Sequence, residues 1–125
     1  MYRLHSKILI IGFIATMNIL FSSQLYSQLN ELTVQRIDPD RAIPVFRSYP
    51  DHAAVIINSS LTNLIFDSNV EIVADLSDPA SGEYRLILPP FRQTISVQLQ
   101  GYKQLRFTVP LTSKRQVLFY EVNPI

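Results

Sequence analysis

Apolar and polar residues alternate in four short runs in the second half of the chain, and no stretch shows a convincing helical period. The runs cover residues 83–88, 94–100, 105–109 and 117–122. Prolines, glycines and polar turns separate them, which is typical of β-strands joined by turns. With weaker runs upstream, the spacing of six or seven strands predicts an all-β fold, a single small antiparallel β-sandwich.

The first half carries weaker strand signals. Residues 31–37 predict a weak first strand, and residues 38–52, with three prolines, predict an irregular linker. Residues 53–58 are apolar on both faces, which suits a central strand. Two further short strands are expected over residues 61–66 and 70–76, with turns at 67–69 and 77–82.

Residues 1–27 have the parts of a secretory signal peptide. Arg3 and Lys7 supply a positive start, and a 14-residue, largely apolar run follows from Ile8 to Phe21. That run is shorter than the roughly 20 residues that span a bilayer. We expect cleavage after the small residue Ser27, and the alternative is an uncleaved membrane anchor. Cleavage would leave 98 residues, with 9 basic and 10 acidic side chains and no transmembrane segment.

The composition excludes several classes of protein. The chain has no cysteine, which rules out disulfides, thiolate metal sites, iron–sulfur clusters and a thiol nucleophile. Its formal net charge of +1 gives no field to attract nucleic acid, so we expect no nucleic-acid partner. Its three glycines cannot supply a phosphate-binding loop or a dinucleotide-binding motif.

An exported domain without disulfides is common among bacterial envelope proteins. We also expect no C-terminal sorting domain after Val122, three residues before the end of the chain. The predicted location is therefore periplasmic or outer-membrane-associated rather than extracellular.

Catalytic chemistry has few candidate residues after the leader. His52 is the only histidine there, no G-x-S-x-G motif accompanies it, and we expect it in an exposed loop. Five carboxylates fall within 17 residues without the spacing of a calcium loop: Asp67, Glu71, Asp75, Asp78 and Glu83. We interpret them as solvated turn charges and expect no catalytic residue, cofactor or metal. The alternatives are a Ca²⁺ site or a two-carboxylate hydrolase.

The aromatic residues of the second half fall into two groups. Tyr84 and Phe107 alternate in phase with aliphatic residues and are predicted to lie in the core. Phe119 and Tyr120 are adjacent and must point to opposite faces of their strand, so one of them is a candidate contact patch if its face is uncovered.

A candidate contact surface combines exposed aromatics with basic residues. Phe91 follows a proline pair and is predicted in a loop, and Tyr102 follows the turn residue Gly101. Residues 83–122 hold six basic and two acidic side chains, which we interpret as charges that keep the sheet soluble; the alternative is a basic sheet face that meets an anionic glycan or a lipid headgroup. The candidate surface is Phe91, Arg92, Tyr102, Lys103 and Arg106.

Two short motifs resemble those of the PEGA-type surface-layer and envelope β-domains. Gly82 and Tyr84 match the Gly-x-Tyr strand start of that family, and Gly101 and Tyr102 match its hairpin ending in glycine and an aromatic residue. Residues 53–67 are also similar to the N-terminal portion of such modules.

The resemblance implies an Ig-like or prealbumin-like sandwich over residues 53–125, after an N-terminal strand and proline-rich linker over residues 28–52. It implies an extracytoplasmic interaction or spacer module with no enzymatic residues.

Two functions remain in competition. The first is a non-enzymatic, exported β-sandwich that serves as an interaction or structural module in a bacterial cell envelope, with an envelope protein as its partner. The second is a carbohydrate- or cell-wall-binding domain that uses exposed aromatics and the basic sheet face to hold a glycan. A small hydrolase, the third class, would depend on His52 or a carboxylate pair.

Overall fold

Eight strands and one short 3₁₀ helix make up the regular structure of the computed structural model, which describes residues 29–41 and 46–125. They are β1 (Leu32–Ile37), β2 (Ala53–Asn58), β3 (Ile65–Ser68), β4 (Ala74–Asp75), η1 (Pro79–Ser81), β5 (Glu83–Leu88), β6 (Gln93–Gln98), β7 (Leu105–Val109) and β8 (Val117–Pro124). The predicted all-β class is confirmed. The predicted signal peptide, residues 1–27, lies outside the described residues.

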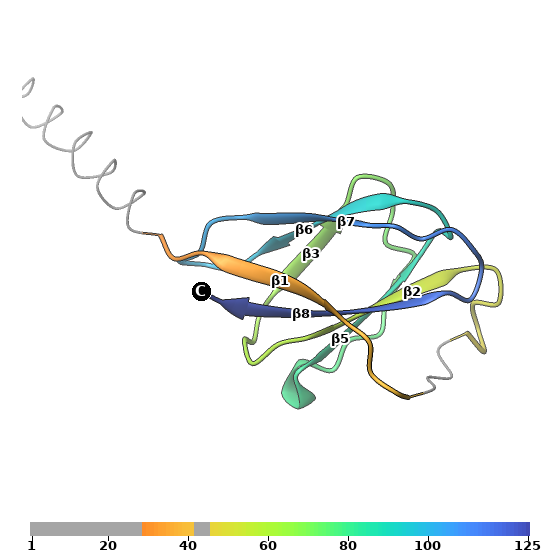
Figure 1. Ribbon diagram of the computed structural model, residues 1–125, viewed down its shortest axis with the longest axis horizontal. Coiled ribbons are helices and arrows are strands. Elements are labelled where there is room, and N and C mark those ends of the chain that lie inside the picture. The colour runs from red at the N-terminus through yellow and green to blue at the C-terminus, as the bar shows by residue number, and fades with distance from the viewer. Residues whose placement is uncertain (1–28, 42–45) are drawn as a thin grey trace, which may run out of the picture.

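The strands form two sheets that stack in a sandwich-like arrangement (Figure 1). One sheet has five strands in the order β1-β8-β2-β5-β4, and the other has three in the order β3-β6-β7. Neighbouring strands are antiparallel except β2 and β8, which are parallel. β2 therefore lies inside the larger sheet, which confirms residues 53–58 as a central strand.

Two of the predicted strands differ from the observed ones. The strand expected over 61–66 begins only at Ile65 and continues through residues predicted as a turn, because Phe66 and Ser68 pair with β6 there. Of the run expected over 70–76, only Ala74 and Asp75 join the ladder, beside β5. Both runs are rich in apolar residues, but pairing with a neighbouring strand decides which residues become strand.

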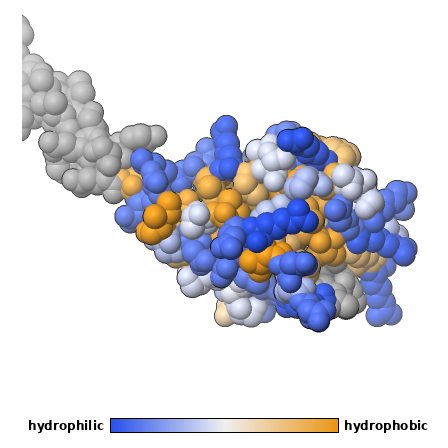
Figure 2. Space-filling model, in the orientation of Figure 1, coloured by the Kyte–Doolittle hydropathy of each residue, from blue (hydrophilic) through white to orange (hydrophobic). Residues whose placement is uncertain are grey.

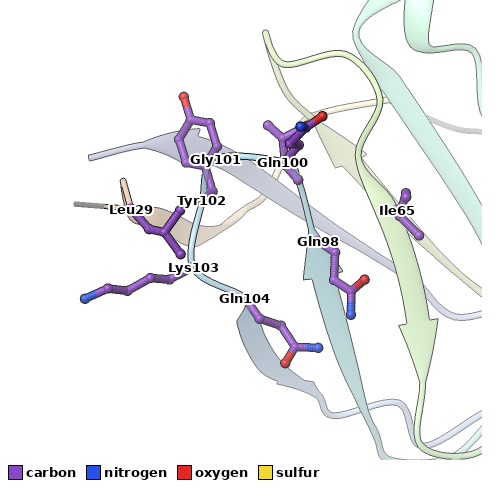
Figure 3. A pocket seen from close by; sticks show the side chains of 9 residues that line it. Leu29, Ile65, Gln98, Gln100, Gly101, Tyr102, Lys103 and Gln104 are labelled. Atoms are coloured by element: carbon purple, nitrogen blue, oxygen red, sulfur yellow. The ribbon is translucent and has the colours of Figure 1, made fainter. Parts of the chain in front are cut away.

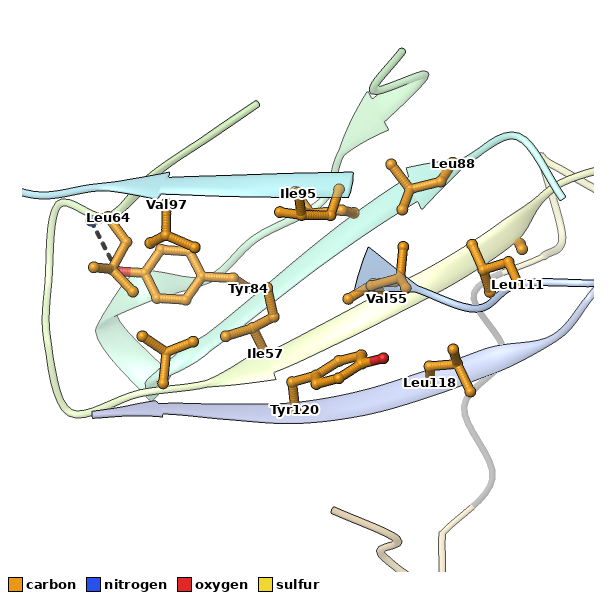
Figure 4. Close-up of a cluster of buried hydrophobic side chains, with 14 of the residues drawn as sticks. Val55, Ile57, Leu64, Tyr84, Leu88, Ile95, Val97, Leu111, Leu118 and Tyr120 are labelled. Atoms are coloured by element: carbon orange, nitrogen blue, oxygen red, sulfur yellow. Dashed lines mark hydrogen bonds between the residues drawn. The ribbon is translucent and has the colours of Figure 1, made fainter. Parts of the chain in front are cut away.

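The main core lies between the two sheets, where alternate side chains of facing strands meet (Figure 4). Its fully buried members include Val55, Ile57, Leu86, Leu88, Ile95, Val97, Val109 and Val122. Tyr84 is only 2% exposed, and Phe107 packs against this core with its ring 4.9 Å from that of Tyr120. Both aromatics were predicted to lie in the core, and that prediction is confirmed.

The connection between β1 and β2 crosses the outer face of the five-stranded sheet. β1 and β2 flank β8 on opposite sides, so the chain changes sides of β8 between these two strands; we call the connection, residues 38–52, the crossing segment. Of this crossing segment, residues 38–41 and 46–52 are described. Phe46 and Tyr49 pack against Ala54 and Ile87, which face away from the main core. The sequence predicted a linker, and the structure shows that it also covers a sheet.

Tyr84 ties the loop between β2 and β3 to the core. Its hydroxyl donates a hydrogen bond to the Leu61 carbonyl (2.8 Å) and accepts one from the Leu64 N–H (3.4 Å) (Figure 4). Its ring meets the Phe66 ring edge-on, with 5.1 Å between centroids. A tyrosine at this position therefore closes a loop as well as filling space.

We expect Tyr84→Phe to lower the free energy of unfolding by about 1–2 kcal/mol, because two backbone groups lose their partner. Urea denaturation measures this difference. Tyr120→Phe is the matched control, because the Tyr120 hydroxyl makes no hydrogen bond with the described residues. Equal, small losses in the two variants would show that the Tyr84 hydroxyl does not hold the loop.

Candidate functional site

The two outer faces of the sandwich differ in how far they are covered. On the five-stranded sheet, Ala54, Ile56 and Ile87 point away from the main core and are nevertheless fully buried. Phe119 points the same way and is also buried, with the Arg41 guanidinium 5.6 Å from its ring centroid. Tyr120 takes the inward position. The outward aromatic of this pair therefore does not form an exposed contact patch.

Arg41 anchors the crossing segment to the sheet through Glu83. The Glu83 carboxylate, only 14% exposed, pairs with the Arg41 guanidinium and with Arg85 Nη2 at 3.0 Å. Burial on its own would raise the pKa of Glu83. The hydrogen bonds and positive charges of Arg85 and Arg41 outweigh it, and the pKa lies below its ordinary value. The ionised carboxylate of Glu83 therefore holds the crossing segment on the sheet through Arg41.

The outer face of the three-stranded sheet is polar and open to solvent. We call it the polar face, and its outward side chains are Ile65, Asp67, Thr94, Ser96, Gln98, Arg106 and Thr108. All of them are exposed or half-buried. Its apolar member Ile65 is 63% exposed. The polar face is thus available for contact, unlike the covered face of the larger sheet.

Two adjoining hollows form a shallow groove along the polar face. One, of about 290 Å³, is lined by Asp67, Ser68, Asn69, Thr94, Ser96, Gln98, Gln104 and Arg106. The other, of about 600 Å³, lies at the β6–β7 turn and is lined by Leu29, Ile65 and residues 98–104. Gln98 and Gln104 line both, so the two hollows adjoin at these residues. Figure 3 shows Ile65 on β3, Gln98 on β6 and Gln104 directly before β7.

The structure divides the predicted contact surface into separate places. Tyr102 and Lys103 lie on the β6–β7 turn at the end hollow, where their side chains diverge (Figure 3), and Arg106 lies on the polar face. Phe91 and Arg92 precede β6, at its opposite end, roughly 20 Å away along six residues of strand. Phe91 is 49% exposed, as predicted, whereas Tyr102 is half-buried and packs against the main core.

The basic side chains of residues 83–122 do not gather on one sheet face. Residues 83–122 alternate between the two sheets, so their basic side chains are dispersed. Arg85 pairs with Glu83 on the larger sheet, and Lys103 and Lys114 reach Glu31 and Asp51 at 3.1 and 3.2 Å. Only Arg106 of the six lines the polar hollow.

Sequence reasoning missed most of the residues that line the groove. The missed side chains include Ser96, Gln98 and Gln104, whereas Asp67 was named among the carboxylates and interpreted as a solvated turn charge. One signal was present, because the polar members of the 94–100 run are the outward residues of β6. The partner strands on either side could not be identified from that run alone.

His52 and the carboxylates were the candidates for chemistry. His52 is half-buried rather than exposed, its Nδ1 atom lacks a hydrogen-bond partner among the described residues, and its ring meets Tyr49 edge-on at 6.0 Å. Across residues 29–41 and 46–125, no three His, Asp or Glu side chains gather as a metal site would require. Among the five carboxylates, Glu83 forms ion pairs with Arg41 and Arg85.

No helix among the described residues is long and apolar enough to cross a membrane. No protein-family model matches the chain, and no curated protein or solved structure shows significant similarity to it. Inferences about function therefore start from the two outer faces described above.

We expect the stability of the fold to fall in acid through Glu83. Because its pKa is depressed in the folded state, its contribution is complete above the ordinary value of 4.5 and is lost as the pH falls below it. Glu83→Gln should remove about 1 kcal/mol from the free energy of unfolding at pH 7 and approach the wild type at low pH. Urea denaturation of the wild type and the variant between about pH 2 and pH 7, the range in which carboxyl groups titrate, measures both differences in the free energy of unfolding.

The control is Glu121→Gln, on the same face and without an ion pair among the described residues. A pH profile that Glu83→Gln and Glu121→Gln alter equally would contradict the anchoring role of Glu83.

Proposed function

We propose that this chain is a non-enzymatic, exported β-sandwich that serves as an interaction module in a bacterial cell envelope, and that it contacts its partner through the polar face. In this proposal residues 1–27 are a cleaved signal peptide, and the sandwich is of the Ig-like or prealbumin-like type found in PEGA domains. The protein acts in the periplasm or at the outer membrane.

The contrast between the outer faces is the observation that carries the proposal. The chain covers one of them with its own crossing segment, and it leaves the other polar and grooved. In the orientation of Figure 2, apolar patches are interrupted by hydrophilic side chains and form no continuous apolar surface. A shallow polar groove suits contact with a partner better than it suits enclosure of a reacting substrate.

The residues behind the PEGA resemblance have structural roles that support this assignment. Gly82 adopts a positive φ of 79°, and a Cβ atom there would lie 3.0 Å from the Ser59 carbonyl oxygen. Gly101, at φ 86°, turns the β6–β7 hairpin, and Tyr102 next to it forms a β-bridge with Asn30. Only glycine adopts such φ values without strain. Fold requirements thus account for the Gly-x-Tyr and Gly-Tyr patterns.

Export is tested by expressing the full chain in a bacterial host and determining the mass of the protein in each cell fraction. We expect a product that begins at Gln28 and is found in the envelope fractions. Ile14→Lys, which puts a charge in the apolar run, should leave an unprocessed cytoplasmic protein, and Ile14→Leu should not. A wild-type chain that stays unprocessed in the cytoplasm would contradict the proposal.

The contact face is tested by affinity capture from an envelope extract of the native cells. Ser96→Trp fills the middle of the polar face, and Thr33→Trp places the same bulk on the exposed outer side of β1. We expect Ser96→Trp to reduce recovery of the captured component at least tenfold and Thr33→Trp to leave it unchanged. Recovery that is insensitive to Ser96→Trp, or lost with Thr33→Trp, would place the contact elsewhere.

A further inference from the structure

Three rows of side chains cross the polar face, each with residues from β3, β6 and β7 or from the positions that directly adjoin these strands, as Asn69 adjoins β3 and Gln104 adjoins β7. The rows are Asn69–Thr94–Thr108, Asp67–Ser96–Arg106 and Ile65–Gln98–Gln104. Successive rows lie about 6.6 Å apart along the strands, and neighbours within a row lie about 4.8 Å apart. The polar groups are thus spread at regular intervals along a groove, an arrangement that suits a linear ligand.

The lining of the groove matches a ligand rich in hydroxyl groups. All eight residues around the 290 Å³ hollow are polar, and they carry hydroxyl, amide, carboxylate or guanidinium groups. Hydroxyl and amide side chains both donate and accept hydrogen bonds. A sugar hydroxyl does the same. Asp67 Oδ1 accepts a hydrogen bond from the Ser68 N–H, and Arg106 Nη2 donates one to Gln104 Oε1. The remaining atoms of these two groups, and the Gln98 amide, can bind hydroxyls of a ligand.

The charges of the groove favour an uncharged ligand. Asp67 and Arg106 lie on either side of Ser96, and neither forms an ion pair with another described residue. Their charges cancel over the face. A nucleic acid or an anionic lipid surface would need a cluster of positive charges instead.

The apolar part of the groove lies at one end, where the end hollow is lined by Leu29, Ile65, Leu99 and Tyr102. Ile65 is the exposed one of these four, and the other three are half-buried. Protein interfaces usually depend on several aromatic or aliphatic anchors in well-packed pockets. One exposed aliphatic side chain offers apolar surface to the C–H face of a sugar ring.

We propose that the groove of the polar face binds an uncharged glycan chain, with Asp67, Gln98 and Arg106 holding its hydroxyl groups and Ile65 packing against one ring. This inference rests on the proposed function and assigns the chemical class of the partner.

The test is calorimetric titration of the exported chain with three tetrasaccharides: β-1,4-linked glucose, α-1,4-linked glucose and β-1,4-linked N-acetylglucosamine. The protein carries no tag, because Leu29 lines the end hollow and the Ile125 N–H bonds to the Glu31 carbonyl nearby. We expect at least one tetrasaccharide to bind. Gln98→Ala and Asp67→Ala should each raise the Kd about tenfold, and Gln35→Ala on β1 should not change it.

Three results would overturn the assignment. They are no binding of any tetrasaccharide, binding that Gln98→Ala and Asp67→Ala leave unchanged, and tighter, salt-sensitive binding of tetragalacturonate. If no tetrasaccharide binds but Ser96→Trp still abolishes capture of an envelope protein, the glycan inference fails and the proposed function stands. If Ser96→Trp affects no captured component, the proposed function fails as well.

Discussion

The parallel pairing of β2 with β8 is the constraint on which the rest of the structure depends. β1 pairs with the opposite edge of β8, so the chain must pass from one side of β8 to the other between Ile37 and Ala53. The inner side of the sheet is filled by the main core, and the passage therefore uses the outer side. Phe46 and Tyr49 then bury apolar residues that would otherwise face water.

This crossing also decides which outer surface of the sandwich stays open to solvent. It covers the central part of the larger sheet, where Phe119 and Ile87 are buried and Glu83 is held by Arg41 and Arg85. The smaller sheet keeps its polar outer side. β2 is apolar on both sides, and β6 is polar on its outer side. The two sheets therefore have outer faces that differ in exposure to solvent.

Period-two alternation explains how much could be predicted. It identified β5 to β8 and the inward positions of Tyr84 and Phe107, because alternation assigns each side chain to one side of its strand. It could not say which sheet a strand joins. Alternation therefore did not reveal that the basic residues of 83–122 are divided between the two sheets. The groove depends on strands β3, β6 and β7 meeting, which long-range pairing decides. No pattern in the neighbouring sequence indicated that Arg41 would cover the Phe119 ring.

Thiol labelling tests most directly whether the crossing segment closes one face and leaves the other open. The chain has no cysteine, so Ala54→Cys under the crossing segment and Ser96→Cys on the polar face each provide a single reporter. In the native protein, we predict that the Ser96→Cys thiol reacts readily with an alkylating reagent and that the Ala54→Cys thiol reacts only after unfolding. Equal reaction rates in the native state would contradict the account.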